Sequence, residues 1–187
     1  MKRILLLLLV FISSSHVFSQ KIALRTSRNG ISLIETNEAK LDTKDDLYIK
    51  LSKLQDSSSH EYYLYFTTEK NNFLSFPAEA KCLLKTFDDK TIQLESFKTS
   101  IEQAGSNKWQ PTTIYLVKEE ELKELFLGVA KIRIEIMKID KKTTTPSLTF
   151  TEKEYKKDKI GGLLEKMYNL ITQEEEKIKK QSSTNGF

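Results

Sequence analysis

Apolar and polar residues alternate along much of the chain between residues 21 and 151, with the period of half-buried β-strands. The clearest case is Lys131–Ile139, in which Ile132, Ile134 and Ile136 point to one face. Asn29-Gly30 and the run Asp88–Lys90 are residues typical of the tight turns between paired strands. Further strands are expected at Lys21–Thr26, Ile31–Thr36, Leu47–Ser52, Glu61–Thr68, Cys82–Phe87, Thr91–Phe97, Thr112–Lys118 and Ser147–Thr151.

Two segments follow the helical period instead. Glu119–Leu127 begins with three glutamates, which favour the positive end of a helix dipole, and Gly128 can end it. Lys156–Lys180 is expected to be a longer amphipathic helix, weakened at its start by a pair of glycines that cost about 1 kcal/mol each relative to Ala. Its apolar stripe comprises Ile160, Leu163, Leu164, Met167, Tyr168, Ile171 and Ile178.

These elements predict a mainly β protein with one domain. We expect an antiparallel β-sandwich of about eight strands, with one short crossover helix and a C-terminal amphipathic helix; a barrel with a terminal helix is the alternative. The expected boundaries are a leader at residues 1–19, a single domain at 20–180 and a flexible tail at 181–187.

The first nineteen residues have the order of a secretory signal peptide. Lys2 and Arg3 precede nine apolar residues, and a serine-rich segment follows with Val17 and Ser19 at the positions that signal peptidase reads. Nine apolar residues are too few to span a bilayer, which takes about 20 in a helix. Cleavage near Ser19/Gln20 would export the protein to the periplasm or the cell exterior. We expect no transmembrane anchor in the remainder, and the residue directly after the cleavage point is Gln20 and not a cysteine that could carry a lipid.

Net charge and cysteine content bear on two further questions, whether the protein binds nucleic acid and whether it contains a disulfide bond. The net charge of +4 falls to +2 without the leader, since 30 basic residues become 28 against 26 acidic ones. Lysines and glutamates are interspersed, so the concentrated basic face of a nucleic-acid-binding protein is not expected. Cys82 is the single cysteine, which excludes an intramolecular disulfide.

Catalytic motifs are scarce. His60 is the single histidine after the leader and stands in an expected turn beside three serines, without a Gly-x-Ser-x-Gly motif anywhere. Cys82 shares its strand face with Leu84, which predicts a buried structural thiol. One Cys and one His do not make a zinc site, and we expect no catalytic residue, metal or cofactor. A hydrolase with two carboxylates brought together from distant strands stays open as an alternative.

A tyrosine-rich strand is the main candidate for binding. Its Tyr62, Leu64 and Phe66 share one face, whereas Tyr63 and Tyr65 share the other, near which Tyr48 could lie. Exposed tyrosines on a sheet bind sugars or protein surfaces. Trp109, in an expected long loop at Lys98–Pro111, completes the candidate set. The competing interpretation is that the core buries one set of tyrosines, the terminal helix covers the other set, and Trp109 anchors its loop. Burial of this kind is more common than exposure for such residues.

Three segments resemble exported β-sandwich proteins of the Bacteroidota: Val17–Gln20, the strand–turn–strand Lys81–Phe97, and Ile114–Leu122 continuing into Gly128–Ile134. This resemblance implies a fold and a location, with no catalytic residues to carry over. The sequence thus predicts an exported, non-enzymatic binding or structural module acting on a protein or glycan through sheet and loop surfaces. The alternatives are the carboxylate-dependent hydrolase and an envelope assembly protein that docks through its C-terminal helix.

Overall fold

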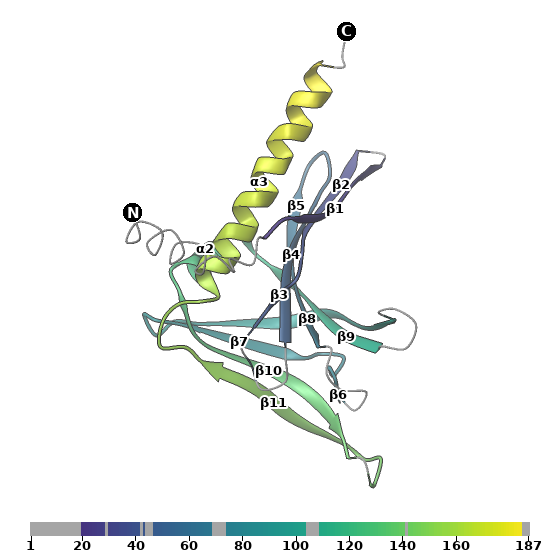
Figure 1. Ribbon diagram of the computed structural model, residues 1–187, viewed down its shortest axis with the longest axis vertical. Coiled ribbons are helices and arrows are strands. Elements are labelled where there is room, and N and C mark those ends of the chain that lie inside the picture. Colours follow the sequence, from purple (N-terminus) through teal and green to yellow (C-terminus); the bar gives the residue numbers. More distant parts are fainter. Residues whose placement is uncertain are drawn as a thin grey trace, which may run out of the picture.

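The computed structural model describes residues 20–28, 30–41, 43, 47–68, 74–103, 109–140 and 142–184. The expected leader, residues 1–19, lies outside the described residues. The protein is mainly β, with antiparallel strands and two helices, one of them C-terminal (Figure 1), as the sequence predicts. Neither helix of this described part is long and apolar enough to cross a lipid bilayer.

The strands form one sheet of eleven within the described residues, in place of the expected eight or so. Its order is β1-β2-β4-β5-β9-β8-β7-β10-β11, with β3 paired to β4 and β6 paired to β10. The unexpected members, β3 and β6, have two residues each, which is too short to show alternation. The bounds are β1 Ile22–Arg28, β2 Ile31–Thr36, β3 Ala39–Lys40, β4 Leu47–Gln55, β5 His60–Thr68, β6 Leu74–Ser75, β7 Lys81–Thr86, β8 Thr91–Gln103, β9 Trp109–Val117, α2 Glu119–Phe126, β10 Val129–Ile139, β11 Pro146–Glu154 and α3 Gly161–Thr184.

Strand β8 joins the two halves of this sheet. Its first residues pair with β7, and from Ser96 onward it pairs with β9, with a bulge between Ser96 and Lys98. A bulge bends a strand and increases its twist. In Figure 1, β3, β4 and β5 accordingly cross β7, β8, β10 and β11 at a steep angle. Both halves contribute to one hydrophobic core, which includes Leu64, Leu84 and Ile134.

The expected loop at Lys98–Pro111 is largely wrong. Strand β8 continues to Gln103 and β9 begins at Trp109, so most of the segment is a hairpin that pairs Ser100 with Thr112. The serine and threonine residues that make this stretch polar are also compatible with a strand, because their hydroxyls can point outward from a paired backbone. Residues 104–108 lie outside the described residues.

Helix α3 begins at Gly161 and ends at Thr184, not at the expected 156 and 180, so it includes the first four residues of the expected tail. Asp158 sets the start, since its carboxylate accepts hydrogen bonds from the backbone N–H of Gly161 at 2.8 Å and of Gly162 at 2.8 Å. Such an N-cap satisfies amides that have no partner within the helix. The same carboxylate accepts a bond from Val129 N at 3.0 Å and thereby joins α3 to the start of β10.

The apolar stripe of α3 packs on the protein's own core. Ile160, Leu164, Met167 and Ile171 are fully buried, and the helix contacts α2, β2 and β4. Farther along, the Lys53 ammonium of β4 lies 2.8 Å from a carboxylate oxygen of Glu175. The helix therefore covers the concave side of the β1–β2–β4 region and is not free along this stripe to dock elsewhere.

Candidate binding surface

The tyrosine-rich strand is β5, and its two faces have different environments. Tyr62, Leu64 and Phe66 are buried in the core, with exposed fractions of 2% or less. Phe66 packs edge-on against the ring of Tyr115 at a centroid distance of 5.8 Å. Tyr62 lies beside the α3 residue Tyr168, with 5.5 Å between ring centroids. The predicted division of this strand into a core face and an outer face is therefore present.

Tyr48, Tyr63 and Tyr65 share the outer face, which is the side of the β1–β2–β4–β5–β9 sheet opposite α3. The register pairs Tyr65 with Lys50 and with Ile114, and Tyr63 with Ser52 and Leu116. Because directly paired residues point to the same side of a sheet, these side chains form one continuous surface. The three tyrosines are half-buried by their neighbours and are not covered by the terminal helix.

An aromatic group forms the most exposed part of this face. Phe97, at the bulge of β8, is 65% exposed, and its ring centroid lies 5.8 Å from that of Tyr63. Leu116, the strand neighbour of Tyr63, is 45% exposed. We call Tyr63, Tyr65, Phe97 and Leu116 the outer patch. Its exposed apolar area is not explained by packing within the described residues.

Polar contacts hold the tyrosines of the outer patch in place. The Tyr63 hydroxyl donates a hydrogen bond to Glu61, which, with some burial, raises the pKa of Tyr63 to about 12. The Lys50 ammonium lies 4.4 Å from the ring centroid of Tyr65 and 3.2 Å from a carboxylate oxygen of Glu35. A cation over an aromatic face is attractive. Such side chains lose little further freedom on binding a ligand, which favours affinity.

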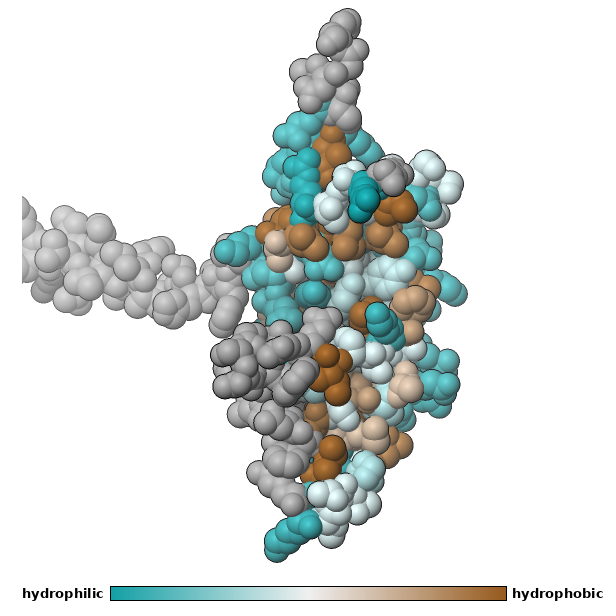
Figure 2. All heavy atoms as spheres, turned by 90° about the vertical axis from the view of Figure 1, so that its right-hand side faces the viewer, coloured by the Kyte–Doolittle hydropathy of each residue, from teal (hydrophilic) through white to brown (hydrophobic). Residues whose placement is uncertain are grey.

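Apolar side chains extend beyond the outer patch. Figure 2 views the sheet from the side and shows a band of them at the height of the β1–β2 hairpin, with smaller groups below. The register places Leu24 and Ile31 on the same outer face as Glu35, and these two residues are 44% and 49% exposed. The hairpin therefore continues the apolar character of the face toward β1, the edge strand.

Trp109, the fourth residue of the predicted binding set, lies at the start of a strand and not in a loop. It opens β9, where its backbone pairs with Gln103, and its side chain lies outside the described residues. Sequence reasoning missed Phe97. Ile92 and Leu94 face the core, so alternation along β8 does place Phe97 on the outer face, but its contact with Tyr63 depends on the pairing of β8, β9 and β5.

His60 lies at the start of β5 and not in a turn. It contacts Glu119 of α2 at 2.8 Å, and the same carboxylate accepts a bond from the Tyr168 hydroxyl at 2.7 Å and pairs with Lys123 at 2.7 Å. The bonds from Lys123, Tyr168 and His60 lower the pKa of Glu119 to about 2. This cluster joins both helices to β5. Because three partners stabilise its charged form, the Glu119 carboxylate is a structural anion and a poor proton acceptor at neutral pH.

The remaining candidate residues form no metal site or reactive thiol within the described part of the chain. Cys82 is fully buried, and the burial raises the pKa of its thiol well above the usual range, as expected for a structural cysteine. No group of three or more His, Cys, Asp or Glu suited to a metal ion occurs among the described residues. Asp88, in the expected turn after β7, accepts a local hydrogen bond from the Thr86 hydroxyl.

Two carboxylates do line one pocket, those of Asp56 and Glu175. Asp56 accepts hydrogen bonds from the backbone and side chains of Ser58 and Ser59, which lower its pKa to about 2. A glycosidase acid needs a raised pKa. Asp56, held ionised in its own turn, is therefore not the acid of such a pair.

Comparison with models of known protein families, with curated proteins and with solved structures gives no match to this chain. The resemblance to exported proteins of the Bacteroidota stays a prediction.

Proposed function

We propose that this chain is an exported, non-enzymatic module that binds another protein through the outer patch of its bent, sandwich-like sheet. The observation that carries the proposal is the exposure of Phe97 against Tyr63 and beside Leu116, on a face that α3 leaves uncovered. Large apolar side chains grouped at a surface favour association with another surface.

The surroundings of the patch favour a protein partner over a sugar. Leucine and phenylalanine side chains offer no hydrogen bonds, whereas the hydroxyl groups of a sugar need donors and acceptors. Charged residues of both signs, including Lys50, Glu61 and Lys98, surround the apolar centre. An apolar centre with a polar rim is the usual anatomy of protein–protein interfaces.

The proposal can be tested by site-specific photo-cross-linking in the cell that exports the protein. A benzophenone amino acid replaces Phe97 in one variant and Leu148 in another. Leu148 is the matched control, since it is 61% exposed on β11, at the opposite edge of the sheet from β1. We expect a discrete cross-linked product from position 97 that is absent from position 148 and that disappears when Leu116→Asp is added.

Once the partner is identified by mass spectrometry, its affinity is measured directly. An aromatic anchor of an interface is worth about 2 kcal/mol, so Phe97→Ala should weaken binding about thirtyfold, whereas Leu148→Ala should change it less than about twofold. Equal cross-linking at both positions, or affinity unchanged by Phe97→Ala, would contradict the proposal.

A further inference from the structure

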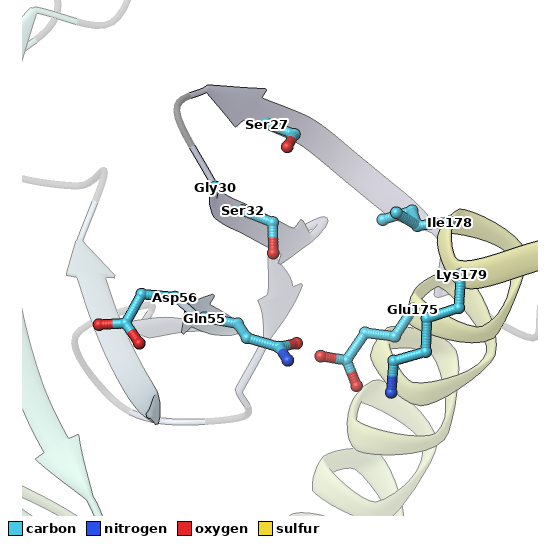
Figure 3. A pocket seen from close by; sticks show the side chains of 8 residues that line it. All are labelled: Ser27, Gly30, Ser32, Gln55, Asp56, Glu175, Ile178 and Lys179. Atoms are coloured by element: carbon cyan, nitrogen blue, oxygen red, sulfur yellow. The ribbon is translucent and has the colours of Figure 1, made fainter. Parts of the chain in front are cut away.

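A pocket of about 190 Å³ lies between the β1–β2 hairpin, the end of β4 and the side of α3 (Figure 3). It is on the face opposite to the outer patch and is independent of the function proposed above. Its lining residues are Ser27, Gly30, Ser32, Gln55, Asp56, Glu175, Ile178 and Lys179. The three elements reach it from distant parts of the chain, so the folded structure alone creates it.

Glu175 gives this pocket a buried anionic group. The residue is only 9% exposed, and its carboxylate points toward the Gln55 amide across the pocket (Figure 3). The ammonium of Lys53 lies 2.8 Å from Oε1 and donates a hydrogen bond to Oε2 at 2.9 Å. Apart from this ion pair with Lys53, Oε1 has no polar partner among the described residues. A carboxylate can accept about four hydrogen bonds, so Glu175 keeps unused acceptor capacity.

Three neutral hydrogen-bonding side chains line the pocket on the side facing this carboxylate, while the ammonium of Lys179 lies on the same helix as Glu175 (Figure 3). Ser27 and Ser32 are neighbours across the β1–β2 pair, and Ser32 pairs with Gln55 on the other side. None of these three side chains makes a hydrogen bond within the described residues. A serine hydroxyl can donate and accept, and a glutamine amide offers both functions on adjacent atoms. The pocket thus presents donors and acceptors in close alternation.

Charge and size restrict the ligand. Lys53 balances the charge of Glu175, and the lining adds one further cation, Lys179, and one further anion, Asp56, so neither a strong anion nor a strong cation is favoured. The volume would hold roughly six waters at about 30 Å³ each. It is below the range of about 300–1,000 Å³ typical of pockets for drug-sized ligands. The side chain of Ile178 adds one apolar wall.

We propose that this pocket binds one ring of a neutral sugar. Ring hydroxyls would donate to Glu175 and exchange hydrogen bonds with Ser27, Ser32 and Gln55, while the C–H side of the ring would contact Ile178. The shared chemistry fits a free monosaccharide or the terminal ring of a glycan.

The test is a two-dimensional ¹⁵N NMR titration of the protein with glucose, galactose, mannose and N-acetylglucosamine, each also as its methyl glycoside. We expect saturable shifts of the amides of Gly30, Ser32, Gln55 and Glu175 with at least one sugar, and a dissociation constant on the order of a millimolar. Binding of the methyl glycoside as well as the free sugar indicates a glycan end; binding of the free sugar alone indicates a monosaccharide.

Variants separate this site from nonspecific effects. Gln55→Ala should raise the dissociation constant about tenfold, the cost of lost hydrogen bonds. Ser32→Ala, which removes a single hydroxyl, serves as a second variant if the first one disturbs folding. Gln93→Ala is the matched control, because Gln93 is an exposed glutamine on β8 outside this pocket. The proposal is overturned if no sugar causes saturable shifts, if both pocket variants bind like the wild type, or if the shifts gather at the outer patch.

Discussion

Gly161 lies where the start of α3 contacts the end of α2, and this contact predicts how an alanine at this position would change the stability of the protein. A Cβ atom added at Gly161 would lie 2.5 Å from the carbonyl oxygen of Leu125 and 2.9 Å from the Cα of Gly128. Both are backbone atoms, which cannot rotate away. At the neighbouring Gly162, the nearest atom to an added Cβ is a carboxylate oxygen of Asp158 at 3.7 Å, an ordinary contact.

The two alanine substitutions should therefore have opposite signs. Gly162→Ala should stabilise the protein by about 0.4–1 kcal/mol, since alanine has less freedom to lose in a helix. Gly161→Ala has the same entropic gain but forces two backbones apart, and overpacking of this kind costs about 1–3 kcal/mol. We expect a net loss of about 1–2 kcal/mol for Gly161→Ala, so the variants should differ by about 1–3 kcal/mol.

Urea unfolding followed by circular dichroism measures both values, and thermal melting gives a second readout. For a protein of this size, 1 kcal/mol corresponds to a shift of about 2–4 °C in Tm. Equal stability of the Gly161→Ala and Gly162→Ala variants would refute the reasoning, because the close approach of α2 and α3 is the feature that distinguishes them.

Three further outcomes follow from buried or paired groups. The pKa of Glu119 is lowered to about 2, chiefly by Lys123, so its stabilisation is complete above pH 4.5 and is lost as the pH falls toward 2. Glu119→Gln should accordingly lower the free energy of unfolding at pH 7 by about 1–2 kcal/mol after allowance for solvent screening, and flatten its decline in acid, as urea titrations at several pH values would show. The thiol of Cys82 should react with a thiol reagent only after unfolding; rapid labelling of the native protein would contradict its burial. Lys53→Met should cost about 3 kcal/mol by leaving the Glu175 carboxylate buried and unpaired, and adding Glu175→Leu should recover most of that loss in the same denaturation assay.

The strands were the most predictable part of the fold. Alternation identified the core side of β10, where Ile132, Ile134 and Ile136 are buried, and placed Gly30 in a turn, where its φ of +80° suits glycine. The order of strands in the sheet was not predictable, because partners such as β5 and β9 are distant in the sequence. The bounds of α3 were wrong because Asp158 competes for the first amides, an effect that the apolar stripe does not encode.

The candidate surface was predictable only in part. The outward position of Tyr63 and Tyr65 follows from alternation within one strand, and the strand pairing adds Tyr48. The contact of Phe97 with Tyr63 required the pairing of β8, β9 and β5, and the pocket beside Glu175 required α3 to meet the first hairpin. Neither relation is written in local sequence, since each depends on contacts between segments that are far apart.

The contact between α3 and the first strands also governs when the protein can fold. Arg25 and Glu174, 149 positions apart, form an ion pair at 2.9 Å, and Leu164 and Met167 complete the core beside β2 and β4. Contacts of such long range slow folding, because the chain must close a large loop before they form. A growing chain that lacks its last helix leaves the apolar side of its first strands open to water. Folding of these first strands therefore finishes only after α3 has been synthesised and is free to pack on them.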